Sequence, residues 1–417
     1  MIYGLIDANS AYASMEQVVD PSLRGKPLCI LSNNDGNVIA RAPQAKALSV
    51  KMSQPAHELK KLVRDEGLIM RSANFALYGD FHRRLVQIVS DMAPQVEVYS
   101  VDELFFTCSG IRDPAEFAQE MRARILQWIG LPTSIGLGTT RGLAKTANKL
   151  SKKGGGVVDL SDPSTHAAHL AALPIEDVWG VGRKWAGKLT ALGITNALQL
   201  RDAPADLILE RFGVVLLRTQ RELAGHVCQQ LQDVEPDRQQ IVVSRSFGNR
   251  VEDHAAVMQA IATFAVGACA KLRARGLVAS AVWIIANTDA FRAELPQHHP
   301  SRAISLPAAT SDTREVLRAI TALSHRFLRK GFAYKRAGVA LMDLARPQNL
   351  QGDLFAPTTV GNDALMATMD QVNRRFGRNT LGIGATGWKK VPAWRMRQNA
   401  LSALSTTKAS ALPIVRC

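Results

Sequence analysis

Two adjacent carboxylates, Asp102 and Glu103, interrupt an apolar run of β-branched and aromatic residues that spans residues 96–106. A third acid, Asp7, directly follows a short apolar stretch, residues 2–6. Both stretches have the composition of buried strands, and strand ends are places where a rigid scaffold can direct side chains at a ligand. Two like charges side by side in a half-buried strand are costly unless a cation offsets them.

Magnesium is the cation that such a group of carboxylates suits. Mg²⁺ prefers oxygen ligands, and two ions about 3.5–4 Å apart can hold the attacking and leaving oxygens of a phosphoryl transfer. In such a site Asp7 and Asp102 would bridge both ions, and Glu103 would hold the ion nearer the attacking hydroxyl. The backbone carbonyl of Ala8 would complete a shell. The alternative is that the acids are turn residues or surface ion pairs, because their spacing does not establish proximity.

A basic run further along the chain favours the first interpretation. Its members recur at steps of four, four, three and one, so most share one helical face: Arg141, Lys145, Lys149, Lys152 and Lys153. A solvated helix face is the ordinary account of such a run, but here the acids that would alternate with it are missing. A triphosphate or a nucleic-acid backbone would neutralise this basic stripe.

The composition indicates a globular protein with a polyanionic partner. The length of 417 residues suits about two to four domains. Hydrophobic residues make up 47% of the chain, which is enough for a normal core. Lys and Arg outnumber Asp and Glu by 51 to 36, and residues 371–417 contain nine Lys or Arg and no acid. Nucleic acid is therefore the expected partner. A membrane surface is the rival, but no amphipathic basic helix stands out and no apolar run approaches the length that spans a bilayer.

The cysteines point to a reducing compartment. They are odd in number, scattered and free of any C-x-x-C pair: Cys29, Cys108, Cys228, Cys269 and Cys417. This pattern is typical of reduced thiols and argues against a disulfide framework or a zinc site. No basic-then-apolar leader opens the chain, so we expect a cytoplasmic protein, associated with the nucleoid when it is bound to DNA.

Hydrophobic patterns predict the elements that position these side chains. The basic run is helical and is stopped by three glycines at residues 154–156. Residues 173–231 are helical in pattern throughout. Strands and helices then alternate in a βαββαβ order, at residues 241–246, 255–275, 278–286, 302–306, 313–330 and 336–344. This order is a split βαβ unit that can form an independent small domain.

Six motifs stand in one order along the chain, namely "DANSAY", "LSNNDGNVIAR", "AKALSVKM", "YSVDE", "LAKTANKLSKK" and "DVWGVGRKWAGKLTALGI". With them the chain resembles the Y-family translesion DNA polymerases of the UmuC type, from its first residue to about residue 355. The resemblance implies an α+β fold with a ferredoxin-like palm, small fingers, a helical thumb with a helix-hairpin-helix, and a βαββαβ little finger. The implied domains are a palm (1–20 and 71–165), fingers (21–70), a thumb (166–230), a linker (231–240), a little finger (241–345) and a basic C-terminal tail (346–417).

The resemblance assigns roles to residues of the palm and fingers. It makes Asp7, Asp102 and Glu103 the catalytic metal ligands, in agreement with the interpretation of the strand ends. Tyr12 matches the steric gate, the side chain under the incoming sugar that excludes a 2′-hydroxyl, although without the family a core tyrosine at a helix start would be the default. Lys46 and Lys152 match basic residues that contact the triphosphate.

Three positions depart from the family pattern. Ala11 stands where many members have an aromatic residue before the gate, and Pro43 stands where some have a triphosphate-binding tyrosine. Both bear on nucleotide affinity and sugar selectivity. Leu104 follows the acidic pair where a small residue is commoner, which bears on local packing of the palm. None of the departures removes a metal ligand.

Two further regions are expected to bind DNA. Residues 178–194 have the form of a helix-hairpin-helix, in which Gly180 and Gly182 would let the backbone present N–H groups to a phosphate, while Arg183 and Lys184 add charge. An ordinary helix–helix turn is the alternative. In the little finger, Arg245 is a candidate phosphate contact, and a solvated arginine is the alternative.

The C-terminal region carries candidate partner sites. Gln351, Leu354 and Phe355 fit the Q-x-x-L-F peptide that docks bacterial polymerases on the sliding clamp. Trp388 and Trp394 lie among basic residues, which suits binding to single-stranded DNA or a protein filament. The alternatives are a disordered basic tail, or tryptophans docked on the body of the protein. In the family this region also contacts processed UmuD-type subunits and the recombinase filament.

These observations predict an error-prone, template-directed DNA polymerase that performs translesion synthesis in the SOS response. It would act on primed, damaged DNA and dNTPs with two Mg²⁺ ions, and would not need a membrane. One alternative is a catalytically degenerate accessory factor that binds DNA and the clamp, which the intact acids argue against. A nucleotide cyclase is another, but it leaves the hairpin motif, the βαββαβ unit and the clamp peptide without a role.

Overall fold

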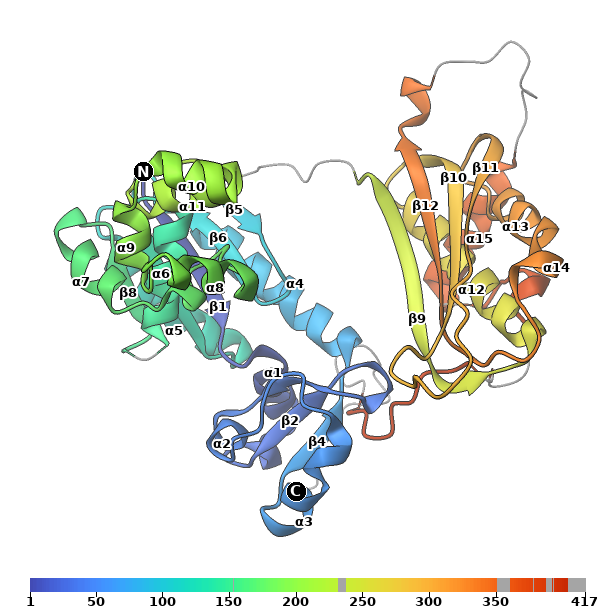
Figure 1. Cartoon of the computed structure of the whole chain (residues 1–417), viewed down its shortest axis with the longest axis horizontal. Helices are drawn as coiled ribbons and strands as arrows, with labels where there is room; N and C mark the ends of the chain where they lie inside the picture. The colour runs from blue at the N-terminus through green and yellow to red at the C-terminus, as the bar shows by residue number, and fades with distance from the viewer. Residues whose placement is uncertain are drawn as a thin grey trace. The chain divides into compact units, whose positions relative to one another are not determined.

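The computed structural model describes residues 1–152, 154–231, 238–350, 361–377, 379–387, 392 and 394–403 (Figure 1). The chain divides into two compact units. The first contains the described parts of 1–32, 36–235 and 400–417, and the second contains 33–35 and those of 236–399.

A five-stranded sheet forms the centre of the first unit, in the order β5-β6-β1-β7-β8. Its strands are β1 (Tyr3–Ala8), β5 (Val96–Val98), β6 (Glu103–Thr107), β7 (Thr133–Gly138) and β8 (Val157–Leu160). β1 is buried along its whole length and pairs antiparallel with β6 and β7, as its unbroken apolar run predicts. The central strand therefore ends at Asp7 and Ala8, between two neighbours.

Helices cover both faces of this sheet: α4 (Phe75–Met92) and α5 (Pro114–Ile129) on one face, and α6 (Arg141–Ser151) on the other. Successive residues of β1 alternate between the two layers, so Ile6 packs with α4 and α5 while Leu5 packs beside α6. α6 crosses β7 so closely that a Cβ on Gly136 would lie 2.0 Å from the backbone nitrogen of Asn148. Glycine at this position allows the basic helix to lie directly on the strand.

A smaller sheet in the first unit has the order β3-β2-β4, with β2 antiparallel to β3 and parallel to β4. Its elements and neighbours are α1 (Ala11–Val19), β2 (Leu28–Leu31), β3 (Val38–Arg41), α2 (Pro43–Ala47), α3 (Lys60–Asp65) and β4 (Ile69–Ser72). Short 3₁₀ helices connect them: η1 (Pro21–Leu23), η2 (Asn33–Asp35, grouped with the second unit) and η3 (Ala56–Leu59).

A helical layer completes the first unit around a core of its own. It contains η4 (Pro163–Thr165), α7 (His166–Ala171), η5 (Ile175–Asp177), α8 (Arg183–Ala191), α9 (Ala197–Asp202), α10 (Ala205–Phe212) and α11 (Val214–Leu223). Its leucines and isoleucines recur at helical spacing and point inward, for example Leu189, Leu200 and Leu216, which are fully buried.

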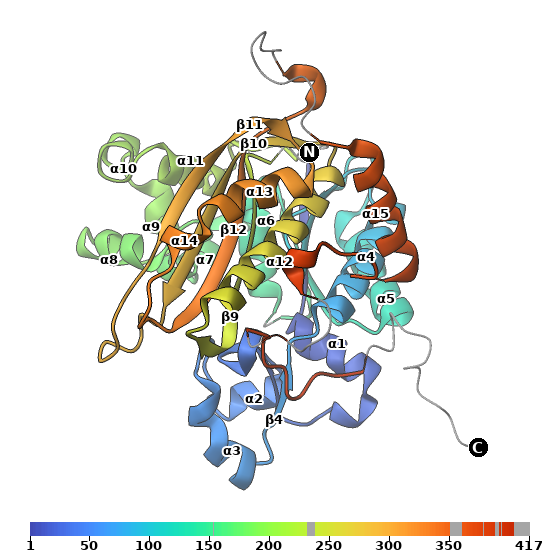
Figure 2. The same ribbon diagram turned by 90° about the vertical axis from the view of Figure 1, so that its right-hand side faces the viewer.

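The second unit has the predicted βαββαβ order and one antiparallel sheet, β11-β10-β12-β9. It contains β9 (Gln240–Val251), α12 (His254–Arg273), β10 (Val278–Thr288), β11 (Ser301–Thr310), α13 (Thr313–Ala322), α14 (Ser324–Phe327) and β12 (Tyr334–Ala345), followed by η6 (Pro347–Asn349), α15 (Asp363–Phe376) and η7 (Gly384–Thr386). α12 and α13 cover one face of the sheet (Figure 2).

By length and composition alone, α12 is apolar enough to cross a bilayer, contrary to the sequence expectation. In this fold its buried residues, among them Ile261, Ala265 and Leu272, form the core against the sheet. Its position in the core of the unit therefore explains why α12 is so apolar. α15 packs beside it, and the Arg273 guanidinium forms a two-point ion pair with Asp370, at 2.7 and 2.8 Å.

Candidate active site

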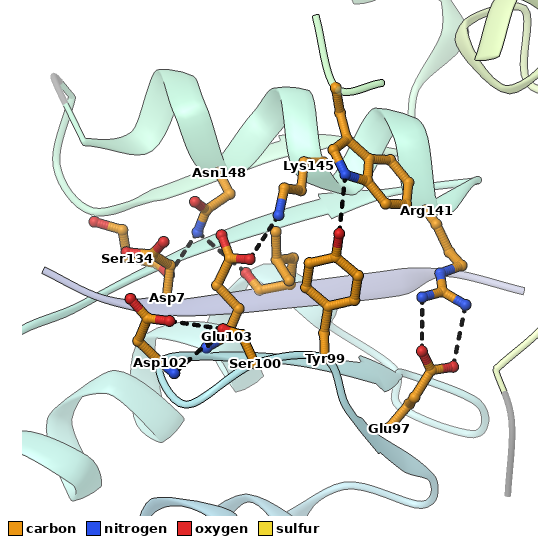
Figure 3. Close-up of polar contacts among 12 residues, drawn as sticks. Asp7, Glu97, Tyr99, Ser100, Asp102, Glu103, Ser134, Arg141, Lys145 and Asn148 are labelled. Carbon is orange, nitrogen blue, oxygen red and sulfur yellow. Dashed lines mark hydrogen bonds and ion pairs between the residues drawn. The ribbon is translucent and has the colours of Figure 1, made fainter. Parts of the chain in front are cut away.

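The three predicted acids converge at the end of β1. The antiparallel register of β1 and β6 places Asp7 opposite Glu103. The backbone N–H of Ala8 donates to the carbonyl of Asp102, at 3.0 Å, which holds the turn before β6 against β1. The hydroxyl of Ser100 donates to Oδ1 of Asp102, at 2.6 Å. Acids remote in sequence therefore lie side by side, as Figure 3 shows.

Two lysines from the basic stripe contact these acids. Nζ of Lys152 lies 2.9 Å from Oδ2 of Asp7, and Nζ of Lys145 lies 2.7 Å from Oε2 of Glu103. Burial raises the pKa of Asp7 to about 6, the Glu103 carboxylate adds to the rise, and Lys152 opposes it. Asp7 is only 7% exposed, so its charge is poorly solvated. A buried acid beside a second acid is an environment that a divalent cation would relieve.

The donor set fits Mg²⁺, although the lysines occupy two of the acids. Among the described residues, no group of three or more His, Cys, Asp or Glu side chains is arranged to hold a metal ion. Asp7 and Asp102 nevertheless line one cavity together with Ala8, so two carboxylate-bearing residues border the same space. Hard oxygen donors of this kind suit Mg²⁺. The metal-ligand role of the acids stays a prediction.

This cavity gathers most of the residues predicted to bind nucleotide or metal. It has a volume of about 410 Å³ and includes Asp7, Ala8, Tyr12, Lys46, Asp102 and Lys152 in its lining. Acids and cations border the same space, which is the combination of charges that a metal-bound triphosphate needs. Glu103 instead lines a neighbouring cavity of about 210 Å³ together with Lys145 and Trp179.

Tyr12 lies at the start of α1 and faces this cavity. Its ring is stacked on that of Tyr78, with centroids 4.4 Å apart and planes 9° apart, and Phe75 meets it edge-on at 6.2 Å. Burial, and then the charge of Asp102, raise the pKa of Tyr12. The side chain is half-buried, so one side is available to a ligand while the other is packed. Its role as a steric gate stays a prediction.

Arg41 is a cavity residue that the sequence reasoning missed. It ends β3 and lines the cavity beside Lys46, whose Nζ donates to the hydroxyl of Ser10 at 2.9 Å. Burial lowers the pKa of Lys46, and the charges of Arg41 and Lys152 lower it further. The Nε of Arg41 is buried without a hydrogen-bond partner in the described part of the chain. The one available signal was its place as the last residue of "LSNNDGNVIAR".

The basic stripe on α6 has acidic partners in the structure, although no acids alternate with it along the run. The acids come from other elements: Arg141 pairs with Glu97 of β5, at 2.7 Å, and Lys149 pairs with Asp177 of η5, also at 2.7 Å. Arg141 is buried and its guanidinium lies 4.3 Å from the centre of the Phe105 ring, which makes it a structural anchor. A polyanion is therefore not needed to neutralise this residue. Lys153 lies outside the described residues.

The predicted helix-hairpin-helix, residues 178–194, contains a turn directly after η5 and then α8. Gly180 has φ +89°, a backbone conformation that residues with a side chain rarely adopt, so this position requires glycine. Gly182 has ordinary extended backbone directly before α8, and no described atom beyond its chain neighbours lies within 4 Å of the place that a Cβ would take. Arg183 and Lys184 are exposed at the start of that helix. The DNA-binding role of all four residues stays a prediction.

Arg245 is exposed, but it lies on the helix-covered side of the second unit's sheet. It shares a strand face with the buried Val243 and Phe247, and it lines a cavity of about 630 Å³ beside α12. On the other face, Arg336 donates to the hydroxyl of Ser244, at 2.9 Å. A contact between Arg245 and DNA stays a prediction.

Several predicted residues of the C-terminal region fall outside the described part of the chain. They are Gln351, Leu354 and Phe355 of the clamp peptide, and Trp388. Trp394 is described: its ring meets Phe264 at 5.6 Å, and its Nε1 donates to Oε1 of Gln259 at 3.2 Å. In the second unit this tryptophan is packed against α12, and not held free for a nucleic-acid base.

Three segments of the chain match known families. The impB/mucB/samB family matches residues 6–149, the C-terminal domain of that family matches residues 238–354, and a domain of unknown function, DUF4113, matches residues 363–415. Protein UmuC of Salmonella typhimurium is 38% identical over 99% of both chains, and Protein ImpB of the same organism is 36% identical over 100% of both. A DNA polymerase IV of Moorella thermoacetica is 28% identical over 92% of this chain and 96% of its own.

Solved structures share the fold. A Y-family DNA polymerase chimera of Dbh and Dpo4 superposes with a TM-score of 0.65, at 20% identity, over 82% of this chain and 99% of that one. An insertion ternary complex of Dbh DNA polymerase superposes with a TM-score of 0.55, also at 20% identity, over 82% of this chain and 98% of that one. The predicted multidomain α+β fold class is confirmed.

Proposed function

The chain belongs to the impB/mucB/samB family of Y-family DNA polymerases, and from this membership we propose that it is an error-prone, template-directed polymerase that performs translesion synthesis in the SOS response. Its substrates would be primed, damaged DNA and dNTPs, as expected of a relative of Protein UmuC. The observation that carries the proposal is the cavity that Asp7 and Asp102 line together with Lys46 and Lys152.

The reaction would be nucleotidyl transfer to the primer 3′-hydroxyl. Asp7, Asp102 and the carbonyl of Ala8 would hold Mg²⁺, with Glu103 toward the primer side. The bound ions would supply Lewis-acid stabilisation of the charge that develops on the phosphate oxygens. When the ions bind, Lys145 and Lys152 would exchange their present ion pairs for contacts with substrate. Glu103 and Asp7 would then be available as metal ligands.

The cations of the cavity would bind and orient the triphosphate. Lys46 and Lys152 offer point charges, and Arg41 brings the charge of its guanidinium to the cavity lining, where its Nη1 donates to the carbonyl of Val50 at 2.5 Å. This guanidinium would add a charged phosphate contact near Pro43, which stands where some family members have a triphosphate-binding tyrosine. Tyr12 would lie under the sugar.

Primer extension across an abasic site tests the proposed function. The full-length chain is assayed with and without the sliding clamp and a processed UmuD-type dimer. We expect insertion opposite the lesion and extension beyond it, increased by these partners. Binding of primed DNA without any incorporation, even with the partners present, would instead favour a degenerate accessory factor.

Arg41→Ala tests the additional nucleotide contact. We expect KM for dNTP to rise about tenfold, equivalent to about 1.4 kcal/mol, because a charged hydrogen bond to phosphate is lost. Arg64→Ala is the matched control, since Arg64 is exposed on α3 and forms an ion pair with the neighbouring Asp65. Steady-state insertion kinetics measure both, and equal KM values for the two variants would exclude Arg41 from the site.

The clamp peptide is tested by pull-down. Replacing Leu354 and Phe355 together by alanine is expected to reduce recovery of the chain on immobilised clamp about a hundredfold, because two apolar side chains no longer fill a pocket. Activity on short primed DNA without the clamp serves as the control and should persist. Equal recovery of variant and wild type would show that this peptide does not contribute to clamp binding.

The remaining partners follow from family membership. We propose that a processed UmuD-type dimer and the recombinase filament contact the basic C-terminal region, and that the protein acts in the cytoplasm at the nucleoid. The support is the likeness to Protein UmuC along the whole chain and the excess of basic residues in this region.

A further inference from the structure

The C-terminal segment lies against the edge of the small sheet in the first unit. The N–H of Ser72 donates to the carbonyl of Ala400, at 3.0 Å, and the N–H of Ala400 donates to the hydroxyl of Ser72, also at 3.0 Å. Leu401 forms a parallel bridge with Ser72, the last residue of the edge strand β4. One isolated β-bridge and one backbone hydrogen bond therefore hold the segment Ala400–Ser402 against the end of β4.

Ser402 ends this segment in a polar network. Its hydroxyl accepts from Nδ2 of Asn74, at 2.9 Å, and donates to Oε1 of Glu16, at 3.1 Å. Asn74 is the N-cap of α4, where its Oδ1 accepts from the N–H of Leu77. Glu16 is 1% exposed, and burial raises its pKa above the ordinary value, although the hydrogen bonds that it accepts from Tyr78 and Ser402 oppose the rise. A buried carboxylate depends on such donors.

The same carboxylate connects to the cavity that Tyr12 lines together with Asp7 and Asp102. The hydroxyl of Tyr78 donates to Oε1 of Glu16, at 2.8 Å, so one oxygen accepts from Tyr78 and from Ser402. Tyr78 is fully buried and carries the ring of Tyr12 stacked upon it. A continuous series of contacts therefore runs from Ser402 through Glu16 and Tyr78 to the ring that lines the cavity.

We propose that the C-terminal segment is a positioning element for the sugar-discriminating tyrosine, with Ser402 as the residue that fixes Tyr12 through Glu16 and Tyr78. This inference rests on the gate role of Tyr12 in the proposed function. Without the hydroxyl, the Asn74 amide and the Glu16 carboxylate each lose a partner in a buried place. Tyr78 can then shift with Glu16, and the ring stacked on it no longer has one fixed position.

Residues 400–402 lie within the segment that matches a domain of unknown function, so the positioning role would be a function of part of that domain. These residues follow the second unit in sequence but belong to the first unit, where they bond to Glu16 of α1, Ser72 of β4 and Asn74, the N-cap of α4. Discrimination between ribose and deoxyribose would therefore depend on a segment that follows the little finger in sequence, and not on the palm and fingers alone.

The test is the ratio of rNTP to dNTP insertion efficiency by the full-length chain on undamaged primed DNA. The ratio does not depend on the fraction of active enzyme, so partial misfolding of a variant cannot mimic the effect. We expect Ser402→Ala to raise the ratio about threefold to tenfold. Ser402→Thr keeps the hydroxyl and should restore the wild-type ratio. Ser22→Ala is the matched control, because it removes an exposed serine–aspartate hydrogen bond of the same unit.

Tyr12→Ala in the same assay separates the inference from the proposed function. If Tyr12→Ala raises the ratio while Ser402→Ala behaves as Ser22→Ala, the positioning role is overturned and the gate stands. If Tyr12→Ala leaves the ratio unchanged, the gate assignment fails and the positioning role fails with it. A raised ratio in Ser402→Ala that Ser402→Thr reverses supports the proposal.

Discussion

Asp102→Ala is expected to abolish dNTP incorporation on primed DNA while duplex affinity stays near that of the wild type. Asp102 lies beside the end of β1 and lines the cavity that Asp7, Lys46 and Lys152 also line. Its carboxylate would hold the ions that stabilise the developing charge, a contribution of several kcal/mol, so we expect kcat/KM to fall at least about a thousandfold. Single-turnover primer extension measures the rate, and fluorescence anisotropy of labelled duplex measures binding.

Glu120→Ala is the control for this experiment. Glu120 lies on α5 of the same unit, is 58% exposed in its side chain and pairs with Arg124. Its replacement removes one negative charge from the same unit and should leave incorporation near the wild-type rate. Normal incorporation by Asp102→Ala would refute the metal-ligand assignment, and a parallel loss of duplex affinity would point to misfolding instead.

Tyr12→Ala is expected to raise the ratio of rNTP to dNTP insertion efficiency about a hundredfold, equivalent to about 2.7 kcal/mol of lost discrimination. The stacked Tyr78 fixes the ring beside the cavity, and removing the ring leaves room for a 2′-hydroxyl. Tyr12→Phe keeps the ring and should keep the discrimination. Insertion kinetics with matched rNTP and dNTP give the ratio. A stable Tyr12→Ala enzyme with the wild-type ratio would make Tyr12 a packing residue only.

Local patterns predicted the second unit well. The apolar stripe of residues 255–275 became α12, which ends near Gly276, a residue with φ +65°. The helix predicted over residues 313–330 is divided into α13 and α14 at Leu323, whose backbone departs toward ψ −4°. β9 continues to Val251, well beyond the predicted end, because its pairing with β12 extends that far. Boundaries depended on tertiary pairing that periodicity does not encode.

The candidate site was predictable in residue type but not in arrangement. Strand ends identified Asp7 and Asp102 as candidates. Their proximity depends on the pairing of β1 with β6, which are far apart in sequence. The family resemblance implied this proximity, whereas the spacing of the residues did not. Lys152 was expected to bind phosphate, and its ion pair with Asp7 joins residues 145 apart in sequence. Ser402 lies 386 residues from Glu16, so no local pattern could connect them.

A pair of divalent ions shared by Asp7, Asp102 and Glu103 is the central claim about this molecule. Electron paramagnetic resonance of Mn²⁺ tests it most directly, with the full-length chain bound to a dideoxy-terminated primer–template and the next dNTP. We predict about two bound Mn²⁺ ions per complex for the wild type and fewer for Asp102→Ala. The same number of tightly bound ions in both proteins would contradict the claim.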